Sequence, residues 1–143
     1  MTARAYLRQL IDLDTLVRAR QEDYEVTLAA ATQMTLRLNR DRVKTSRNLK
    51  RQEELAVRMT EIGIEIEKAT STLIELKQEA RALIERLEDN RHKAVLIHRY
   101  INCRSWAYIA ENMGYTVRHV TRLHGEALVR FQHVLECPTM SVV

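Results

Sequence analysis

Apolar positions in the middle of the chain follow an unbroken heptad pattern. Apolar or small residues recur there at alternating steps of four and three. The positions are Leu55, Met59, Ile62, Ile66, Ala69, Leu73, Leu76, Ala80, Leu83 and Leu87. This spacing is typical of a helix that packs along one stripe, and the span corresponds to about 50 Å of helix. We therefore expect a long helix over about residues 48–89.

The N-terminal third carries a weaker heptad pattern. One row repeats every seven residues, at Leu10, Val17, Tyr24, Ala31 and Leu38. A second row contains Tyr6, Leu13 and Met34, and it is interrupted by Arg20 and Thr27. Because such a stripe is too weak to stand alone, a helix over residues 3–38 needs an apolar partner.

The stripe of residues 55–87 is the best partner for the first helix, and a polar, basic connection joins the two segments. We expect a long antiparallel helical hairpin, a coiled coil, as a first domain over residues 1–88. In an alternative arrangement, one or both stripes pair between two chains and form a homodimer. Heptads do not distinguish these arrangements.

Residues 89–136 change character and predict shorter helices. The expected helices cover about residues 89–101, 105–113 and 116–135. Pro138 ends the last one, because proline lacks an amide donor and clashes with the preceding turn. The predicted fold class is therefore all-α, with a second domain over residues 89–136 and a tail over residues 137–143.

The pattern around Gly114 is that of a helix-turn-helix. The glycine lies between two helical segments, where a left-handed backbone conformation costs other residues more. Ser105 and Thr116 stand where an N-cap hydroxyl accepts from a backbone amide. The inner faces of the two segments carry apolar or small residues: Ile109, Ala110, Met113, Val120, Leu123, Ala127 and Phe131.

The outer face of the second segment carries residue types that read DNA. Arginines donate to guanine or phosphate, a threonine offers a hydroxyl and a methyl group, and a glycine leaves room for the bases. The candidate DNA-binding residues are Thr116, Val117, Arg118, His119, Thr121, Arg122 and Gly125. Beside the first segment, the candidate phosphate contacts are Arg104, Ser105 and Tyr108.

Residues 87–131 resemble region 4 of bacterial sigma factors. The matching positions are Val95, Leu96, Arg99, Tyr100, Ser105, Ile109, Ala110, Met113, Gly114, Val120, Ala127 and Leu128. The resemblance implies a sigma region-4-like helix-turn-helix domain that reads promoter-like DNA with its last helix and contacts RNA polymerase. No segment resembles the aromatic-rich part of a sigma factor that melts promoter DNA, so a self-sufficient sigma factor is not expected.

The whole chain is more similar still to an uncharacterised family of small phage and prophage proteins of Gram-positive bacteria. An "A-x-x-Y-L-x-Q" motif is matched by Ala3, Tyr6, Leu7 and Gln9, and a "V-x-x-S" connection by Val43 and Ser46. The signature "R-Y-I … W-x-x-I-A-x-x-M-G-Y-[ST]-x-R-H-V-x-R-L-H-x-x-A-L" is matched from Arg99 to Leu128. This resemblance implies a phage-derived protein that borrows the region-4 fold.

Charge is distributed unevenly along the chain. Residues 37–51 carry seven basic side chains against one acidic, and residues 91–143 carry seven against three. Residues 52–90, which lie between them, carry five basic against ten acidic side chains. Two positive segments point to a polyanionic partner more firmly than the net charge of +4 does.

The first positive segment has two interpretations of equal weight. It is a second nucleic-acid patch that binds phosphates, or it is a solvated tip whose charge offsets the acidic helix beside it. Its members are Arg37, Arg40, Arg42, Lys44, Arg47, Lys50 and Arg51.

Other chemistry is not supported by the residue spacing. His119 and His124 are five residues apart, not the four that would place two metal ligands on one helix face, so they are interpreted as phosphate donors or exposed side chains. The chain has no phosphate-binding glycine loop and no nucleophile elbow, so neither an enzyme nor a cofactor is expected.

The cysteines and the hydropathy indicate a compartment. Two cysteines, Cys103 and Cys137, fit a reducing cytoplasm better than a disulfide scaffold. No apolar run approaches the roughly 18 residues that a membrane span needs. A cytoplasmic protein without a membrane partner is expected.

Three functions fit these patterns. The first is a phage-derived transcription regulator that binds double-stranded DNA through residues 104–125 and contacts RNA polymerase. The second is a phage DNA-packaging protein, because small terminase subunits also join a helix-turn-helix to an oligomerising helical hairpin. The third is an interaction protein that binds polymerase and no DNA. Oligomeric state separates the first two, since a packaging subunit forms a large closed ring.

Overall fold

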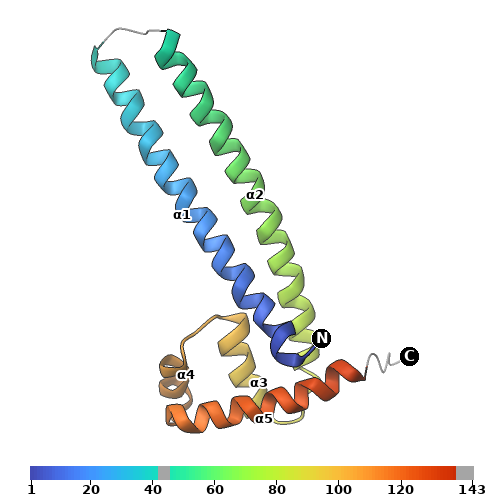
Figure 1. The fold of residues 1–143 in the computed structure, drawn as a ribbon. Coiled ribbons are helices and arrows are strands. Elements are labelled where there is room, and N and C mark those ends of the chain that lie inside the picture. Colours follow the sequence, from blue (N-terminus) through green and yellow to red (C-terminus); the bar gives the residue numbers. More distant parts are fainter. Residues whose placement is uncertain (42–45, 138–143) are drawn as a thin grey trace. The chain divides into compact units, whose positions relative to one another are not determined.

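The structure, a computed structural model, describes residues 1–41 and 46–137, the side chains of residues 38–41 excepted. These residues form helices and no strand, so the all-α prediction is confirmed for them. The elements are α1 (Ala3–Asp41), α2 (Ser46–Ile84), α3 (Asn90–Leu96), a π-helical turn η1 (Ile97–Ile101), α4 (Trp106–Met113) and α5 (Val117–Glu136) (Figure 1).

The helices contain two breaks that the sequence pattern does not predict. Helix α2 ends at Ile84 rather than near residue 89, and Leu87 N donates to Ile84 O (3.0 Å) in a tightened last turn. The following helix then turns π-helical at Ile97, where Asn102 N donates to Ile97 O (2.9 Å). Neither break carries a glycine or proline, which explains why the sequence pattern ran through both.

The chain divides into two compact units. The first, here called the base unit, comprises Met1–Asp14 and Leu73–Val143, and the second, the arm unit, comprises Thr15–Thr72. The start of α1 and the end of α2 therefore belong to the same compact unit as α3, α4 and α5. The domain bounds at residues 88/89 and 136/137 stay a prediction.

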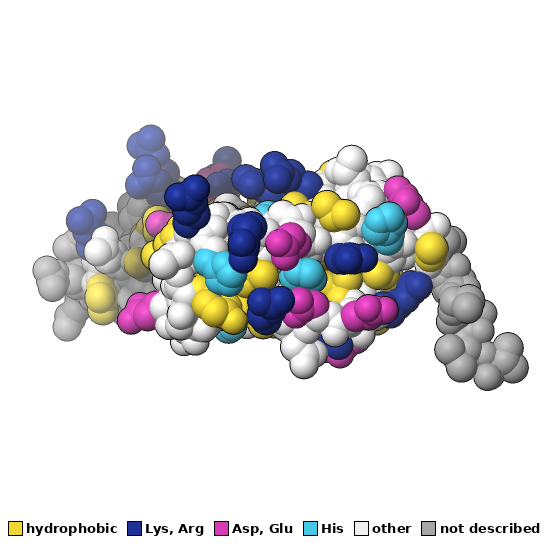
Figure 2. Space-filling model, turned by 90° about the horizontal axis from the view of Figure 1, so that it is seen from below, with side chains coloured by type: hydrophobic (Ala, Val, Ile, Leu, Met, Phe, Trp, Pro, Cys, Tyr) yellow, Lys and Arg dark blue, Asp and Glu magenta, His cyan; other side chains and the backbone are white. Residues whose placement is uncertain are grey.

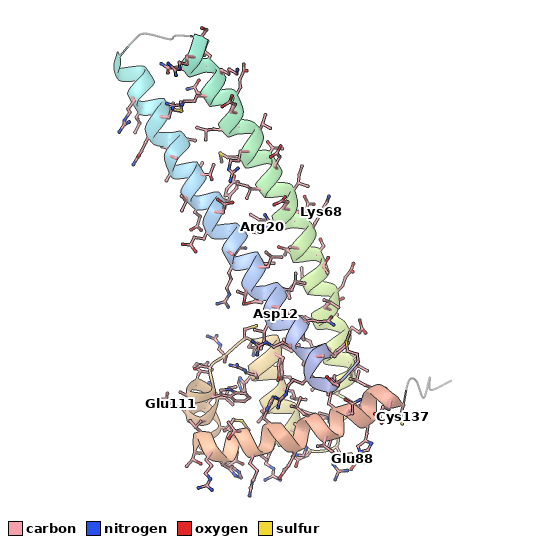
Figure 3. All side chains as sticks on the ribbon, in the orientation of Figure 1. Asp12, Arg20, Lys68, Glu88, Glu111 and Cys137 are labelled. Atoms are coloured by element: carbon pink, nitrogen blue, oxygen red, sulfur yellow. The ribbon has the colours of Figure 1, made fainter. Side chains whose placement is uncertain are left out.

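In the arm unit, segments of α1 and α2 lie side by side (Figure 1). Val17 and Ile62 are buried there, and so is Thr27, which interrupts the apolar row of the sequence. Arg20, the other interruption (labelled in Figure 3), forms an ion pair with Glu65 of α2. Two inward heptad positions of α1 thus carry polar side chains, Arg20 and Thr27.

The base unit has one large apolar core. Twelve buried residues form it, and they come from α1, α2, the connection after α2, α3, η1 and α5. They are Ala3, Leu7, Leu10, Ala80, Ile84, Leu87, Leu96, Tyr100, Ile101, Ala127, Leu128 and Phe131. The amide of Ala3 also donates to Gln132 Oε1 (2.6 Å), which fixes the start of α1 on α5.

A second, smaller cluster joins α4 to α5. Its buried residues are Val95, Ile109, Ala110, Val120 and Leu123, with Trp106 and Met113 packed at its edge. Burial of these side chains provides the main attraction between the two helices, at about 25 cal/mol for each Å² of apolar surface. The orientation of α5 in the base unit is therefore set by two cores on its inner side.

Candidate nucleic-acid interface

The corner between α4 and α5 is built by three residues that the sequence singles out. Gly114 has φ 71° and ψ 29°, the left-handed conformation that glycine adopts at least cost. Ser105 caps α4, since its side chain accepts from Tyr108 N (3.2 Å). Thr116 caps α5 in the same way and accepts from His119 N (3.1 Å). These three sequence predictions are confirmed.

Substituting the glycine at this corner is expected to destabilise the base unit by about 1 kcal/mol. A Cβ at Gly114 would meet no atom within 4 Å, so the cost of Gly114→Ala is conformational, from holding alanine at positive φ. Gly125→Ala is the matched control: this position is helical and equally open, so alanine there should stabilise by about 0.5–1 kcal/mol.

Urea unfolding followed by the fluorescence of Trp106, the chain's one tryptophan, measures both substitutions within the base unit. Equal changes in the two variants would contradict the special role of the corner.

The inner face of α5 is buried along its length. Val120, Ala127 and Phe131 have no exposed surface, and Leu123 has 1%. The inward-facing assignment of these residues is confirmed. Because both cores hold this face, the opposite face of the helix is turned to solvent.

The outer face of α5 carries the predicted DNA-reading side chains. Thr116, Val117, Arg118, Thr121, Arg122 and Gly125 are all exposed, and His119 is half-buried. No ion pair in the described part of the chain engages Arg118 or Arg122. Both guanidinium groups are thus open to an external anion.

The start of this face is ordered by contacts among its own side chains. Arg122 Nη2 donates to His119 Nδ1 (3.0 Å), which requires that nitrogen to be unprotonated. The ring of Tyr115 meets the ring of His119 edge-on at 4.5 Å between centroids. Toward its C-terminal end the face becomes mixed in charge, with Glu126 and Glu136 exposed. The N-terminal half of α5 is therefore the part suited to a polyanion.

The three candidate phosphate contacts lie around the start of α4 and are exposed. The Arg104 guanidinium lies over the ring of Tyr108, 4.7 Å from its centroid. Ser105 uses its hydroxyl oxygen as the N-cap acceptor, and its O–H proton stays available to an outside acceptor. Arg99 Nη1 donates to the Arg104 carbonyl (3.0 Å), so the preceding turn holds this corner in place.

The second basic patch is described only in part. The side chains of Arg37, Arg47, Lys50 and Arg51 are exposed. The side chain of Arg40 and the residues Arg42 and Lys44 lie outside the described residues. The patch stays a prediction.

His124 is a correction to the sequence analysis, because it is neither exposed nor placed to bind a phosphate. It is 8% exposed, and its Nε2 lies 2.7 Å from the Tyr100 hydroxyl. Burial lowers the pKa of His124 to about 4, with Arg4 and Arg99 adding to the effect. Burial also raises the pKa of Tyr100, so its hydroxyl keeps its proton and donates it to a neutral imidazole.

The buried His124 predicts a specific loss of stability in mild acid. Its pKa is 6.5 in the unfolded chain and about 4 in the folded one, so between these values only the unfolded state takes up the proton. The free energy of unfolding should therefore fall as the pH drops from 6.5 towards 4, by about 2 kcal/mol from about pH 8 to pH 5.

Urea midpoints of the wild type and of His124→Gln at both pH values give the measurement, since glutamine keeps a hydrogen-bond partner for Tyr100 without titrating. The same pH dependence in both proteins would refute the assignment.

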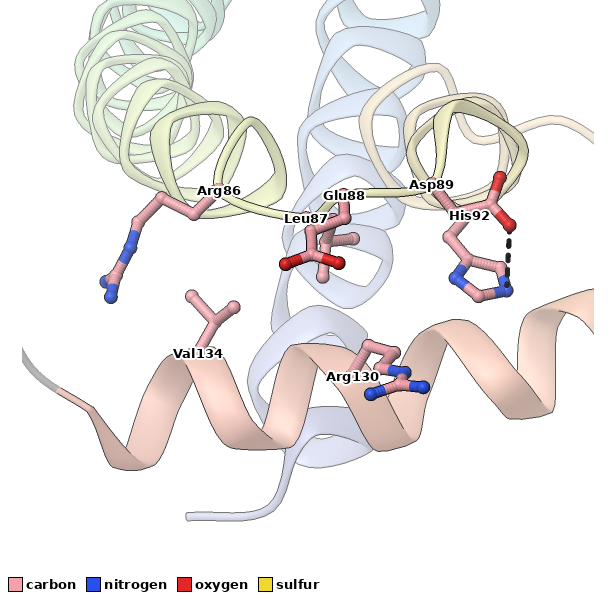
Figure 4. Close-up of a pocket in the computed structure, with 7 residues that line it drawn as sticks. All are labelled: Arg86, Leu87, Glu88, Asp89, His92, Arg130 and Val134. Atoms are coloured by element: carbon pink, nitrogen blue, oxygen red, sulfur yellow. Dashed lines mark ion pairs between the residues drawn. The ribbon is translucent and has the colours of Figure 1, made fainter.

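A cleft of about 280 Å³ opens between the α2–α3 connection and α5 (Figure 4). Its lining residues are Arg86, Leu87, Glu88, Asp89, His92, Arg130 and Val134. Asp89 caps α3 by accepting from Arg91 N (2.8 Å). Because carboxylates and guanidinium groups alternate on its walls, the cleft has no preference for phosphate.

The described residues offer neither a metal site nor a membrane span. Among the described residues, no group of three or more His, Cys, Asp or Glu side chains is placed to hold a metal ion. Within the same residues, no helix combines the length and the hydrophobicity that a bilayer span requires.

The sequence analysis did not predict the contacts among the side chains that lie on the inner side of this interface. His124 follows Val120 by four residues and precedes Ala127 by three, so the helical period already places it on the inner face. Arg99 stacks on Trp106, 4.6 Å from the ring centroid, and Trp106 meets His124 edge-on at 4.7 Å. No spacing rule connects residues 99, 106 and 124, because they come from three different elements, η1, α4 and α5.

Comparison with known proteins identifies a family. Neither the curated proteins nor the solved structures contain a match to this chain. A family model described as "Protein of unknown function (DUF1492)" matches residues 28–129, a range that includes α4 and the N-terminal half of α5. Since the matched range covers more than half of the 143 residues, the chain belongs to the DUF1492 family.

Proposed function

We propose that this protein binds double-stranded DNA, with the N-terminal half of α5 in the major groove. The observation that carries the proposal is the two-sided character of α5. Its inner face is held by two apolar cores, and its outer face presents Arg118 and Arg122 without an internal carboxylate partner. A recognition helix needs both properties, because the scaffold must fix the helix while long donors reach base edges and phosphates.

In this proposal α4, the Gly114 turn and α5 form a helix-turn-helix like that of sigma region 4. The N-cap hydroxyls, the left-handed glycine and the close packing at Ala110 support it. Arg104, Ser105 and Tyr108 contact the DNA backbone at the start of α4. These contacts set the position of α5 on the duplex without reading sequence.

The long helices form an antiparallel hairpin of coiled-coil type, which serves contact with RNA polymerase or pairing into a homodimer. The buried positions Val17, Thr27 and Ile62 support a seam between α1 and α2. The protein acts as a phage-derived transcription regulator in the cytoplasm and not as an enzyme. The sequence resemblance to sigma region 4 and to phage proteins supports this role.

Selection from a pool of random duplexes tests the proposal. The expected result is enrichment of one sequence, and light scattering should give the mass of a monomer or dimer on that duplex. A large ring on DNA without sequence preference would favour the packaging function instead. Absence of binding at about 0.15 M salt, an ionic strength that leaves close charge pairs effective, would leave only the polymerase-binding function.

A further inference from the structure

The base unit carries arginines beside α5 that the proposed interface does not include. Arg4 and Arg8 lie one turn apart on α1 and are both exposed. Their neighbours Ala3 and Leu7 are buried in the core that contains Phe131 of α5. The start of α1 is therefore fixed against α5, and both arginines point away from this core.

Arg4 borders the outer face of α5 directly. It lines a shallow groove of about 380 Å³ together with Val129, Gln132 and His133. Val129 is 60% exposed and follows Gly125 by four residues and Arg122 by seven, so it continues the stripe of DNA-reading positions. The groove, which Glu136 also lines, thus joins the start of α1 to the C-terminal half of this face, next to the N-terminal half that is proposed to enter the major groove.

The charges of Arg4, Arg8 and Arg99 also reach one buried pair of side chains, Tyr100 and His124. The positive charges of all three act on the buried Tyr100 hydroxyl, and those of Arg4 and Arg99 act on His124. Arg99 in turn donates to the Arg104 carbonyl (3.0 Å) at the start of α4. The arginines of α1 therefore act on the same buried pair as Arg99, which contacts Arg104.

We propose that Arg4 and Arg8, in the first turns of α1, bind backbone phosphates of the duplex whose major groove takes α5. This inference rests on the proposed function and extends its interface from residues 104–125 to the N-terminus of the chain. Figure 2 shows Lys and Arg side chains spread over the face that carries α5, mixed with acidic ones. Arginine is suited to phosphate, because its planar fork can donate two parallel hydrogen bonds.

One existing contact of Arg8 must yield to the phosphate. Arg8 Nε lies 3.5 Å from Asp12 Oδ1 in an exposed pair, with side-chain exposures of 62% and 69%. Exposed pairs of this kind contribute little, so exchange of the carboxylate for a phosphate is not strongly opposed.

The test is the salt dependence of binding to a mixed-sequence duplex of about 30 base pairs, roughly three helical turns. Each phosphate contact adds about 0.9 to the slope of log K against log salt, so the double variant Arg4→Ala/Arg8→Ala should lower the slope by about 2. Its affinity at about 0.1 M salt should fall by roughly 10- to 60-fold. The variant Arg4→Lys/Arg8→Lys, which keeps the charge, should restore most of the slope.

Two controls separate this inference from the proposed function. Arg58→Ala/Arg81→Ala removes two exposed arginines of α2 and should leave the slope nearly unchanged. One outcome would overturn the inference about α1 alone. In that outcome the wild type binds the duplex, Arg118→Ala weakens the binding, and Arg4→Ala/Arg8→Ala has the same slope as the α2 control. If the wild type binds neither this duplex nor any duplex from the random pool, both proposals fail. Trp106 fluorescence checks that each variant keeps its fold.

Discussion

Replacing Arg118 or Arg122 by alanine should weaken binding of the selected duplex by about 1–3 kcal/mol for each arginine that pairs with a guanine edge. This corresponds to roughly a 5- to 150-fold loss of affinity. Both side chains are exposed on a helix whose inner face is buried, so their removal should not disturb the fold. The double variant should bind more weakly than either single variant.

The structure suggests that the two arginines will not contribute equally. Arg122 already donates to His119 Nδ1 (3.0 Å), so it must share or exchange this partner to reach a base. The same contact holds its guanidinium in place before DNA arrives, which reduces the entropy lost on binding. The losses of binding free energy from substituting neighbouring residues are not expected to add, so a double-mutant cycle is needed to separate the two effects.

A control on the same helix makes this result specific. Arg130 is exposed on α5 too, but it lines the cleft with Arg86 and Asp89 (Figure 4) instead of the outer stripe. Arg130→Ala should therefore change affinity and salt slope much less than Arg118→Ala does. Fluorescence anisotropy of a labelled duplex measures all variants. Equal losses at positions 118 and 130 would indicate a general effect of charge and not a recognition face.

Truncating Leu7 to alanine should destabilise the base unit by about 2–5 kcal/mol. Leu7 has no exposed surface and packs in the core with Ile84 and Phe131. The substitution removes apolar contacts and leaves a cavity that the neighbouring helices fill only in part. Although residue 7 is distant from α4 in sequence, Trp106 fluorescence on α4 should report the loss.

Leu36→Ala is the matched control for Leu7→Ala. Leu36 is 61% exposed and belongs to the arm unit, so its truncation should change the free energy of unfolding by less than about 0.5 kcal/mol. If both substitutions left the Trp106 transition unchanged, the start of α1 would not be part of the folded base unit. The inference about Arg4 and Arg8 would then lose its structural basis.

Periodicity predicted the parts of this fold that depend on local chemistry. The heptad stripe is buried or half-buried at every position from Leu55 to Leu83 in α2 and at Leu87 just after it. The caps at Ser105 and Thr116 and the left-handed Gly114 follow from the conformations that these residue types prefer. Each of these predictions needed only residues a few positions apart.

Features that depend on residues far apart in the chain could not be predicted from the sequence. The core of the base unit joins Ala3, Leu7 and Leu10 to residues more than sixty positions away, and no local pattern identifies that partner. The break after Ile84 lacks a proline or glycine, so the stripe continued through it to Leu87. The burial of His124 depends on Tyr100 of the π-helical turn and on Trp106 at the start of α4, which lie 24 and 18 positions before it.

Interference by methylation of guanine N7 tests the placement of α5 in the major groove most directly. N7 faces that groove, and an arginine that binds guanine donates to it. If α5 reads the duplex there, methylation of one or more guanines in the selected site should abolish binding by the wild type and add little to the loss in Arg118→Ala or Arg122→Ala. Two results together would contradict that placement. The wild type would bind a duplex methylated at every guanine without loss, and Arg118→Ala and Arg122→Ala would bind as tightly as the wild type.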